Sequence, residues 1–220
     1  MRTAVYGSGG HGKVVADNII SAGEHELVAY LEDDAEKAGR RIGGLQVRSV
    51  APGIRPVARE LRLRGIALGV GDNEARRRIA TRCRRARLDV VRAIHPSATV
   101  AGSAKLGMGV ALMAGSVVNP FAEIREGAVV NTAASVDHDC IVGRYVHVFP
   151  GARLAGTVEV GEFSYIGMGA SIVQNVNIGK RVTVGAGAVV LDDLEDGVTA
   201  VGVPARKVKS SRASQGTRDG

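Results

Sequence analysis

The sequence is poor in the residues that build most globular cores. Among its 220 residues there is no tryptophan, and phenylalanine, tyrosine and tryptophan together make up 3% of the chain. The core must therefore be assembled from aliphatic side chains, which suits a narrow, regular structure better than a globular sandwich. Only two cysteines occur, Cys83 and Cys140, and we expect them in different domains, so no disulfide is predicted.

Long apolar runs are missing as well. No stretch approaches the roughly 18 consecutive apolar residues that a membrane-spanning helix needs. The first residues, MRTAVYGSGG, lack the hydrophobic centre of a signal peptide. We therefore predict a cytoplasmic protein without a membrane span.

Acidic residues are outnumbered, with 22 Asp and Glu against 29 Lys and Arg and a net charge of +7. Much of the positive charge lies in the arginine-rich segment 76–87, and apolar residues recur at helical spacing on its opposite face: Ala75, Ile79, Cys83 and Ala86. A solvated basic helix face explains this pattern better than nucleic-acid binding, because no aromatic residues interleave the arginines for base stacking. We expect no nucleic-acid partner.

A six-residue repeat organises the second half of the chain. Every sixth position from Ile94 to Val190 is aliphatic, seventeen positions in all, and the residue four places later is usually small. Six is a multiple of the strand period of two, so the aliphatic side chain always returns to the same side of an extended chain, which a helix cannot achieve. Short strands separated by turns at this spacing predict a parallel β-solenoid.

The aliphatic position, the glycine that often follows it and the small residue four places later resemble the repeats of the hexapeptide-repeat acyltransferases. That resemblance implies a left-handed parallel β-helix with three six-residue faces per coil. Residues eighteen apart would then stack at the strand spacing of about 4.8 Å. The handedness comes from the resemblance alone, since parallel crossovers are usually right-handed. We expect this domain at 94–209, closed by the segment VTAVGVPARKVK, with a disordered tail at 210–220.

The residues before the repeat alternate between strand and helix patterns. Extended apolar segments are expected at 2–7, 26–31, 66–70 and 89–94, and helices at 13–22, 57–63 and 74–87, with a glycine-rich connection at 43–44. This alternation predicts a small Rossmann-like α/β domain with a parallel sheet over residues 1–93. The predicted fold is thus an α/β Rossmann-like domain followed by an all-β left-handed parallel β-helix.

The turn between the first strand and the first helix is rich in glycine. It follows a G-x-G-x-x-G pattern and reads Gly7-Ser8-Gly9-Gly10-His11-Gly12. Free N–H groups and the positive end of the helix dipole favour a phosphate there. Because a dinucleotide site needs two such halves and only one fits before the repeat, a single nucleotide is the better prediction. A tight turn without a ligand is the alternative.

Three stretches, GSGGHGKVVAD, YLEDD and GVGDNEARRRIA, resemble the N-terminal domain of sialic acid O-acetyltransferases and sugar N-acetyltransferases of the NeuD/PglD type. In that family the domain holds a nucleotide-linked sugar. The resemblance therefore implies an acceptor site at Gly7, Ser8, Gly9, Gly10, His11, Glu32 and Asp33. Glu32 stands where the family commonly has aspartate, and the identity of the sugar stays open.

Two of the five histidines lie in the middle of the repeat. The run NTAASVDHDCIVG resembles the catalytic segment of the same family. The resemblance implies that His138 is the general base, that Asp139 is its partner and that Asn131 is a supporting polar residue. It also places His147 beside the acyl-thioester.

The eighteen-residue stacking rule adds residues to the cofactor site. It puts Gly156 one coil from His138, and in the family the matching glycine N–H binds the thioester oxygen. A second column, Pro150, Met168 and Ala186, is flanked by glycines and would leave room for a pantetheine arm. The predicted cofactor site comprises His147, Gly156, Gly167, Met168, Gly185 and Ala186.

Together these features predict an acetyl-CoA-dependent acetyltransferase that acts on the amino group of a nucleotide-activated sugar. No Ser or Cys is seen paired with a base, so direct attack with a histidine base is expected. The resemblance implies a homotrimer with sites between subunits. The alternatives are an O-acetyltransferase of sialic acid-like sugars and a non-catalytic sugar-nucleotide binding module. A zinc carbonic anhydrase would need a third histidine ligand, and His95 lies about two coils away, so no metal is expected.

Overall fold

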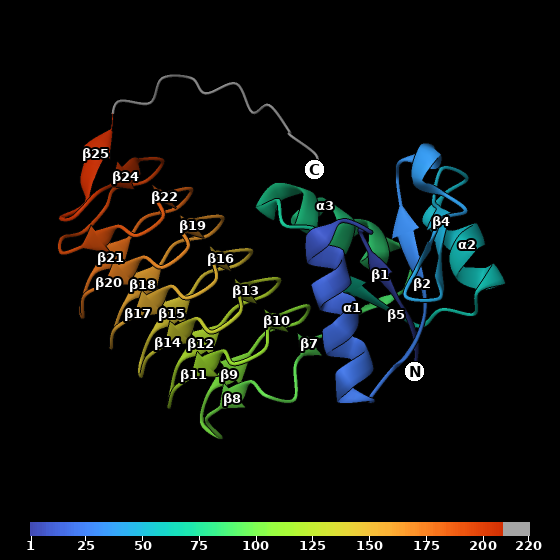
Figure 1. The fold of residues 1–220 in the computed structure, drawn as a ribbon, viewed down its shortest axis with the longest axis horizontal. Helices are drawn as coiled ribbons and strands as arrows, with labels where there is room; N and C mark the ends of the chain where they lie inside the picture. The colour runs from blue at the N-terminus through green and yellow to red at the C-terminus, as the bar shows by residue number, and fades with distance from the viewer. Residues whose placement is uncertain (209–220) are drawn as a thin grey trace.

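The computed structural model describes residues 1–208, which form an N-terminal α/β domain followed by a long prism of short strands (Figure 1). The tail predicted for 210–220 lies outside the described residues. In Figure 1 the prism extends away from helices α1 and α3, which face it from the N-terminal domain. No helix in the described part of the chain is long and apolar enough to cross a membrane.

The N-terminal domain is built on a six-stranded sheet in the order β3-β4-β2-β1-β5-β6. Its strands are β1 (Arg2–Tyr6), β2 (Glu26–Glu32), β3 (Arg41–Ile42), β4 (Leu45–Ser49), β5 (Gly65–Leu68) and β6 (Asp89–Val90). Its helices are α1 (Gly10–Ala22), α2 (Ile54–Glu60) and α3 (Asn73–Arg85), with a 3₁₀ turn η1 (Ala35–Lys37). All neighbouring strands are parallel except the β3–β4 pair, which confirms the predicted Rossmann-like domain.

Two segments of this domain differ from the prediction. The glycine pair 43–44 is the turn of a β3–β4 hairpin, and both residues have positive φ, 54° and 82°. The single strand predicted over 89–94 is two strands, because Val91 N donates to Ile66 O in the first sheet whereas Ala93 N donates to Val110 O in the prism. Both pieces are extended and partly apolar, so the sequence pattern alone does not show where the chain changes sheets.

The prism consists of seventeen two-residue strands, and the second residue of each is the aliphatic one that the repeat predicts. They are β7 (Ala93–Ile94), β8 (Thr99–Val100), β9 (Lys105–Leu106), β10 (Ala111–Leu112), β11 (Val117–Val118), β12 (Glu123–Ile124), β13 (Val129–Val130), β14 (Ser135–Val136), β15 (Ile141–Val142), β16 (His147–Val148), β17 (Arg153–Leu154), β18 (Glu159–Val160), β19 (Tyr165–Ile166), β20 (Ser171–Ile172), β21 (Asn177–Ile178), β22 (Thr183–Val184) and β23 (Val189–Val190).

Strands three apart in the chain pair in parallel and form three sheets, the three faces of the prism. Residues eighteen apart are partners, as in Leu112 with Val130 and Val136 with Leu154, so the predicted coil length is confirmed. The aliphatic and small residues point inward and form one continuous buried cluster. Every corner from Gly109 to Gly187 places one residue in the left-handed region, among them Asp139 with φ 59°.

The end of the prism is closed by the strands β24 (Thr199–Val201) and β25 (Arg206–Val208). Strand β24 continues a face by pairing with β22, and β25 folds back on it in antiparallel fashion. The predicted closing segment is therefore a hairpin rather than a single strand. Cys83 and Cys140 are both free and buried, one in each domain.

The two domains are joined through a buried arginine on α3. Arg76 is fully buried and donates hydrogen bonds to the carbonyl oxygens of Gly127 (2.8 Å) and Tyr145 (3.0 Å) in the prism. It also donates to Gly71 O (3.0 Å) and to Asn73 Oδ1 (2.7 Å) in its own domain. The sequence placed Arg76 on a solvated basic face together with Arg77 and Arg78, which are indeed exposed. For Arg76 the prediction was wrong, because the prism covers its side chain and carbonyl oxygens replace water.

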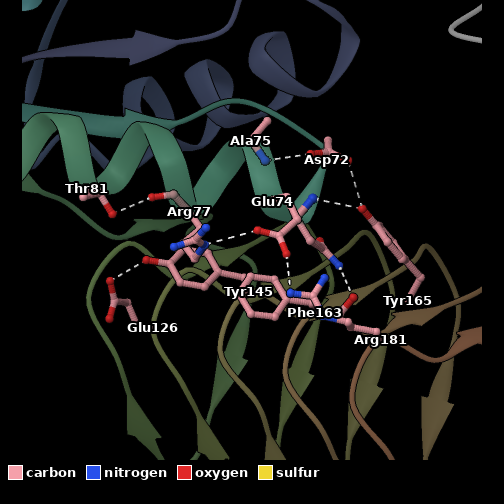
Figure 2. Close-up of polar contacts among 11 residues, drawn as sticks. Asp72, Glu74, Ala75, Arg77, Thr81, Glu126, Tyr145, Phe163, Tyr165 and Arg181 are labelled. Carbon is pink, nitrogen blue, oxygen red and sulfur yellow. Dashed lines mark hydrogen bonds and ion pairs between the residues drawn. The ribbon is translucent and has the colours of Figure 1, made fainter. Parts of the chain in front are cut away.

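Further polar contacts across the same interface are shown in Figure 2. Glu74 at the start of α3 forms an ion pair with Arg181 of the prism at 2.6 Å. Tyr165 Oη accepts a hydrogen bond from the Asn73 N–H at 2.9 Å. These contacts, together with Arg76, hold the start of α3 against the face that contains β16 and β19.

Candidate functional site

The glycine-rich turn connects β1 to α1, and its glycines have two different tasks. A β-carbon on Gly7 would lie 2.6 Å from Gly69 O, and one on Gly12 would lie 2.0 Å from Gly7 O. These two glycines allow the close packing of the turn against the loop after β5. Gly9 and Gly10 have open space around them, so the backbone at the start of α1 is accessible there.

The two acids at the end of β2 are held by different partners. Glu32 Oε1 accepts hydrogen bonds from the Ser8 N–H (2.7 Å) and the Ser8 hydroxyl (2.6 Å), which brings it to the glycine-rich turn. Asp33 accepts from the Tyr6 hydroxyl and from Arg82, each at 2.8 Å. Burial and the hydrogen bond to Asp33 raise the pKa of Tyr6. Neither Tyr6 nor Arg82 is marked by any sequence motif as a partner of Asp33.

His138 lies at an exposed corner of the prism after β14. Its Nδ1 lies 2.8 Å from Asp139 Oδ2, and both side chains are more than half exposed. Asp137, the other flanking acid, accepts instead from the His138 backbone N–H (2.7 Å) and from Asn119 (2.8 Å). The hydrogen bond to Asp139 raises the pKa of His138. With its Nδ1–H donated to Asp139, the ring presents an unprotonated Nε2 to solvent.

Gly156 lies against the imidazole of His138, one coil away. A β-carbon on Gly156 would lie 2.5 Å from His138 Cε1, and the Thr157 N–H donates to His138 O at 2.9 Å. The stacking predicted from the eighteen-residue rule is therefore present. Within residues 1–208 the Gly156 N–H has no hydrogen-bond partner.

Asn131 lies against His147 and not against His138. Its Nδ2 donates to His147 Nε2 at 3.0 Å, while its Oδ1 accepts from the Thr132 N–H at 2.8 Å, which fixes the orientation of the amide. His147 Nδ1 lies 3.4 Å from Gly71 O, so the ring carries its proton on Nδ1 and accepts at Nε2. Within one chain Asn131 therefore contacts His147, and its role as a supporting polar residue of the catalytic site stays a prediction.

His147 is 3% exposed and lines a pocket of about 570 Å³ between the two domains. Its ring stacks on Phe149 with centroids 4.2 Å apart, and the ring of His11 lies 5.4 Å away. Burial and the nearby Arg76 guanidinium lower the pKa of His147 to about 3 and that of His11 to about 4. Both rings are therefore neutral at physiological pH, and His11 of the glycine-rich turn lines this pocket.

The predicted column of small residues is only partly an open groove. Gly169 N donates to Pro150 O at 3.0 Å, so successive corners stack as expected, and Met168 is exposed. A β-carbon on Gly167 would lie 2.5 Å from a backbone oxygen of the next coil, and one on Gly185 would lie 2.7 Å from the closing hairpin. These two glycines permit coil stacking, whereas open space lies beside the neighbouring glycines at 169 and 187. Ala186 lies in the chain between the packed Gly185 and the open Gly187.

The two histidine clusters lie on different faces of the prism. His147 belongs to β16 and His138 follows β14, and these strands are in different sheets. In the described part of the chain neither cluster makes a hydrogen bond to the other. Residues 1–208 also contain no group of three or more His, Cys, Asp or Glu side chains that could hold a metal ion.

Comparison with known proteins assigns both domains. The family model of the PglD N-terminal domain matches residues 2–83, and the model of the bacterial transferase hexapeptide (six repeats) matches residues 157–192. The acetyltransferase domain of PglB from Neisseria gonorrhoeae, solved with acetyl coenzyme A, is 38% identical, with a TM-score of 0.86 and coverage of 94% of this chain and 98% of that one. The chain belongs to the PglD-type acetyltransferase family.

Other members of this PglD-type family show the same fold. A histidine-to-alanine variant of GDP-perosamine N-acetyltransferase from Caulobacter crescentus, solved with CoA and GDP-perosamine, is 38% identical with a TM-score of 0.89, over 96% of this chain and 98% of that one. UDP-N-acetylbacillosamine N-acetyltransferase of Bacillus subtilis is 36% identical over 112 residues, and the match spans 50% of each chain. The predicted family and the left-handed parallel β-helix of the PglD-type fold are confirmed.

Proposed function

We propose that this protein transfers the acetyl group of acetyl-CoA to the amino group of a nucleotide-activated sugar. The observation that carries this proposal is the exposed His138–Asp139 pair with Gly156 stacked on its ring. The activity is supported by the N-acetyltransferases that share 38% of their residues with this chain and bind CoA or acetyl-CoA. Acetyl-CoA is a co-substrate here, and no step requires a metal.

The chemistry is direct attack of the sugar amine on the thioester. The neutral Nε2 of His138 takes the proton of the amine as the nitrogen bonds to the carbonyl carbon, while Asp139 holds the Nδ1–H and stabilises the imidazolium. The Gly156 N–H donates to the oxygen that becomes negative, a contribution of about 3 kcal/mol in comparable acyl transfers. The C–S bond then breaks, and the CoA thiolate leaves and takes the proton back from His138.

His147 and Asn131 have a different role in this proposal. His147 does not serve as a base at neutral pH in spite of its neutral ring, because its pKa of about 3 gives it little affinity for a proton. Its Nε2 is already engaged by the Asn131 amide. The pair instead lines the pocket in which the acyl group and the pantetheine arm would lie, next to Met168. Gly167, Gly185 and Ala186 are not among the described residues that line this pocket, and in this proposal they contact the arm further along the prism.

The site proposed here needs two copies of the chain. His138 and His147 lie on different faces of one prism, so a pocket that contains both requires the prism of a neighbour. A closed threefold arrangement brings one corner of each prism against the face of the next. We therefore propose a homotrimer with three equivalent sites between subunits.

The acceptor would bind in the N-terminal domain, residues 1–93, and react on the β-helix domain that follows at 94–209. The open backbone at Gly9 and Gly10, at the start of α1, is suited to a phosphate. Ser8 and Glu32 stand beside it and can hold a sugar hydroxyl. His11, on the same turn, links this region to the pocket of His147.

The test is a thiol-release assay with acetyl-CoA and a panel of UDP-, GDP- and dTDP-linked amino sugars together with free sialic acid. We expect release only with an amino sugar, and a product that resists hydroxylamine because an amide, unlike an ester, is stable to it. Release with sialic acid and a hydroxylamine-labile product would identify an O-acetyltransferase instead. Binding of nucleotide sugars without any thiol release would leave only a binding module.

A further inference from the structure

A second cavity lies on the N-terminal domain and is lined by five arginines. Its volume is about 680 Å³, and the arginines are Arg55, Arg59, Arg62, Arg64 and Arg87. None of the described residues that line it is acidic. The cavity lies within the range of about 300–1,000 Å³ that is usual for small-molecule sites.

This cavity is separate from the proposed acceptor site. Two of its lining segments, 62–64 and 86–88, directly precede β5 and β6 and therefore lie at the edge where the parallel strands begin. The glycine-rich turn follows β1 and lies at the opposite edge, where the strands end. A ligand in the arginine-lined cavity would not touch residues 7–12.

The charges in the cavity are not neutralised by the protein. Arg55 donates to Arg85 O at 2.6 Å at the end of α3. The other four side chains make no hydrogen bond or ion pair with the residues that the structure describes. Glu60, next to Arg59 in sequence, is paired with Arg48 at 2.6 Å, whereas Asp89, two residues after Arg87, forms no ion pair with the described residues. The arginines are exposed, so water screens their mutual repulsion, and an anion between them would lower it further.

The backbone adds a second, independent observation. Arg62 and Arg87 have φ of 54° and 60°, the left-handed region, and each directly follows the C-terminal cap of a helix. Glycine is the favoured residue at that position because other side chains are strained there. The chain instead has arginine at both places, and both line the same cavity.

We propose that the arginine-lined cavity binds a soluble small molecule that carries two or more phosphate groups. Planar guanidinium groups recognise phosphate oxygens in bidentate fashion. The cavity has several guanidinium groups around a space that is too small for a nucleic-acid duplex. No aromatic residue lines it, so base stacking does not contribute. The inference does not rest on the proposed function.

The test is titration calorimetry of the full chain with inorganic tripolyphosphate at fixed ionic strength. We expect about one site per chain and a Kd raised about tenfold or more in the double variant Arg62→Gln, Arg87→Gln. The matched control is Arg40→Gln, Arg78→Gln, which removes the same charge from exposed positions outside the cavity and should change the Kd by less than about twofold.

A further variant tests whether weaker binding of tripolyphosphate is due to loss of folding. Arg62→Gly, Arg87→Gly places the favoured residue at both left-handed positions, so its Tm without ligand should match or exceed that of the wild type. The rise in Tm that tripolyphosphate causes in the wild type should be lost in this variant. Equal weakening by both glutamine pairs would show that only net charge matters and would overturn the proposal. Binding to DNA or anionic vesicles without binding to tripolyphosphate would overturn it as well.

Discussion

Gly156 lies so close to His138 that a β-carbon there would displace the imidazole: it would be 2.5 Å from Cε1 and 2.6 Å from Nε2. The contact joins two successive coils at one corner of the prism. It places an unpaired backbone N–H next to the proposed base. The geometry of the proposed oxyanion donor and of the base is therefore determined by one stacking relationship.

The first prediction tests this contact. Gly156→Ala should displace the His138 ring and lower kcat by about 10²-fold, the usual scale for loss of a general base. His138 is exposed and free to turn away, so the Tm should change little. Gly102→Ala is the matched control, since Gly102 lies three coils from Gly156 in the same corner column and has open space around it. Equal losses in both variants would show that the effect is not due to the ring.

The second prediction concerns the base and its partner. His138→Ala should lower kcat by about 10²-fold or more with little change in the KM for acetyl-CoA. Asp139→Asn should cost less, and it should move the acidic limb of the kcat–pH profile to lower pH. The sign follows because Asp139 raises the pKa of His138, and the base works only when it is neutral. If the acidic limb of the profile did not move in Asp139→Asn, the group that titrates there would not be His138.

The third prediction tests the site between subunits. His138→Ala and His147→Ala homotrimers should each be nearly inactive. Trimers formed by co-expression in equal amounts should recover about a quarter of wild-type activity, because about a quarter of the sites receive both histidines. The mass in solution should be three times the 22.8 kDa of one chain. An active monomer, or mixed trimers without recovery, would contradict a site built from two chains.

The fourth prediction concerns the glycine-rich turn. Gly9 has an extended conformation, with φ −75° and ψ −170°, and open space around it, so Gly9→Val should fold normally. Its side chain would occupy the place of the acceptor phosphate and raise the KM for the nucleotide sugar. The KM for acetyl-CoA serves as the internal control and should be nearly unchanged. Equal increases in both would argue against separate binding regions.

The fifth prediction concerns stability in acid. The folded chain keeps His147 and His11 neutral, with pKa values of about 3 and about 4, while the unfolded chain protonates them near pH 6.5. Below pH 6.5 the unfolded state binds more protons than the folded state. As the pH is lowered, the free energy of unfolding should therefore fall by up to about 1.4 kcal/mol per pH unit for each ring. Denaturant titrations between pH 7 and about 4 measure this slope. His11→Asn should reduce it, and an unchanged slope would contradict neutral burial.

Much of the fold could be predicted because the repeat constrains it at every coil. A slip of one residue would turn the aliphatic side chains of a strand outward, so the core itself determines the register. The strand at 89–94 could not be divided in this way, since its two halves pair with different sheets through backbone groups alone. The hairpin around Gly43 was missed because its strands are short and contain only one buried residue, Val47.

In the candidate site, too, some features follow from the repeat and others depend on tertiary packing. The six-residue period by itself determined a parallel β-solenoid with its aliphatic side chains inside. The stacking of Gly156 on His138 followed once the family resemblance supplied three faces per coil, because residues eighteen apart then meet. Only the tertiary structure decided that Arg76 is buried, that Asn131 contacts His147 and that His147 and His11 stay neutral. These features depend on how α3 and the glycine-rich turn pack against the prism, and the desolvation and carbonyl contacts that result have no periodic signature in the chain.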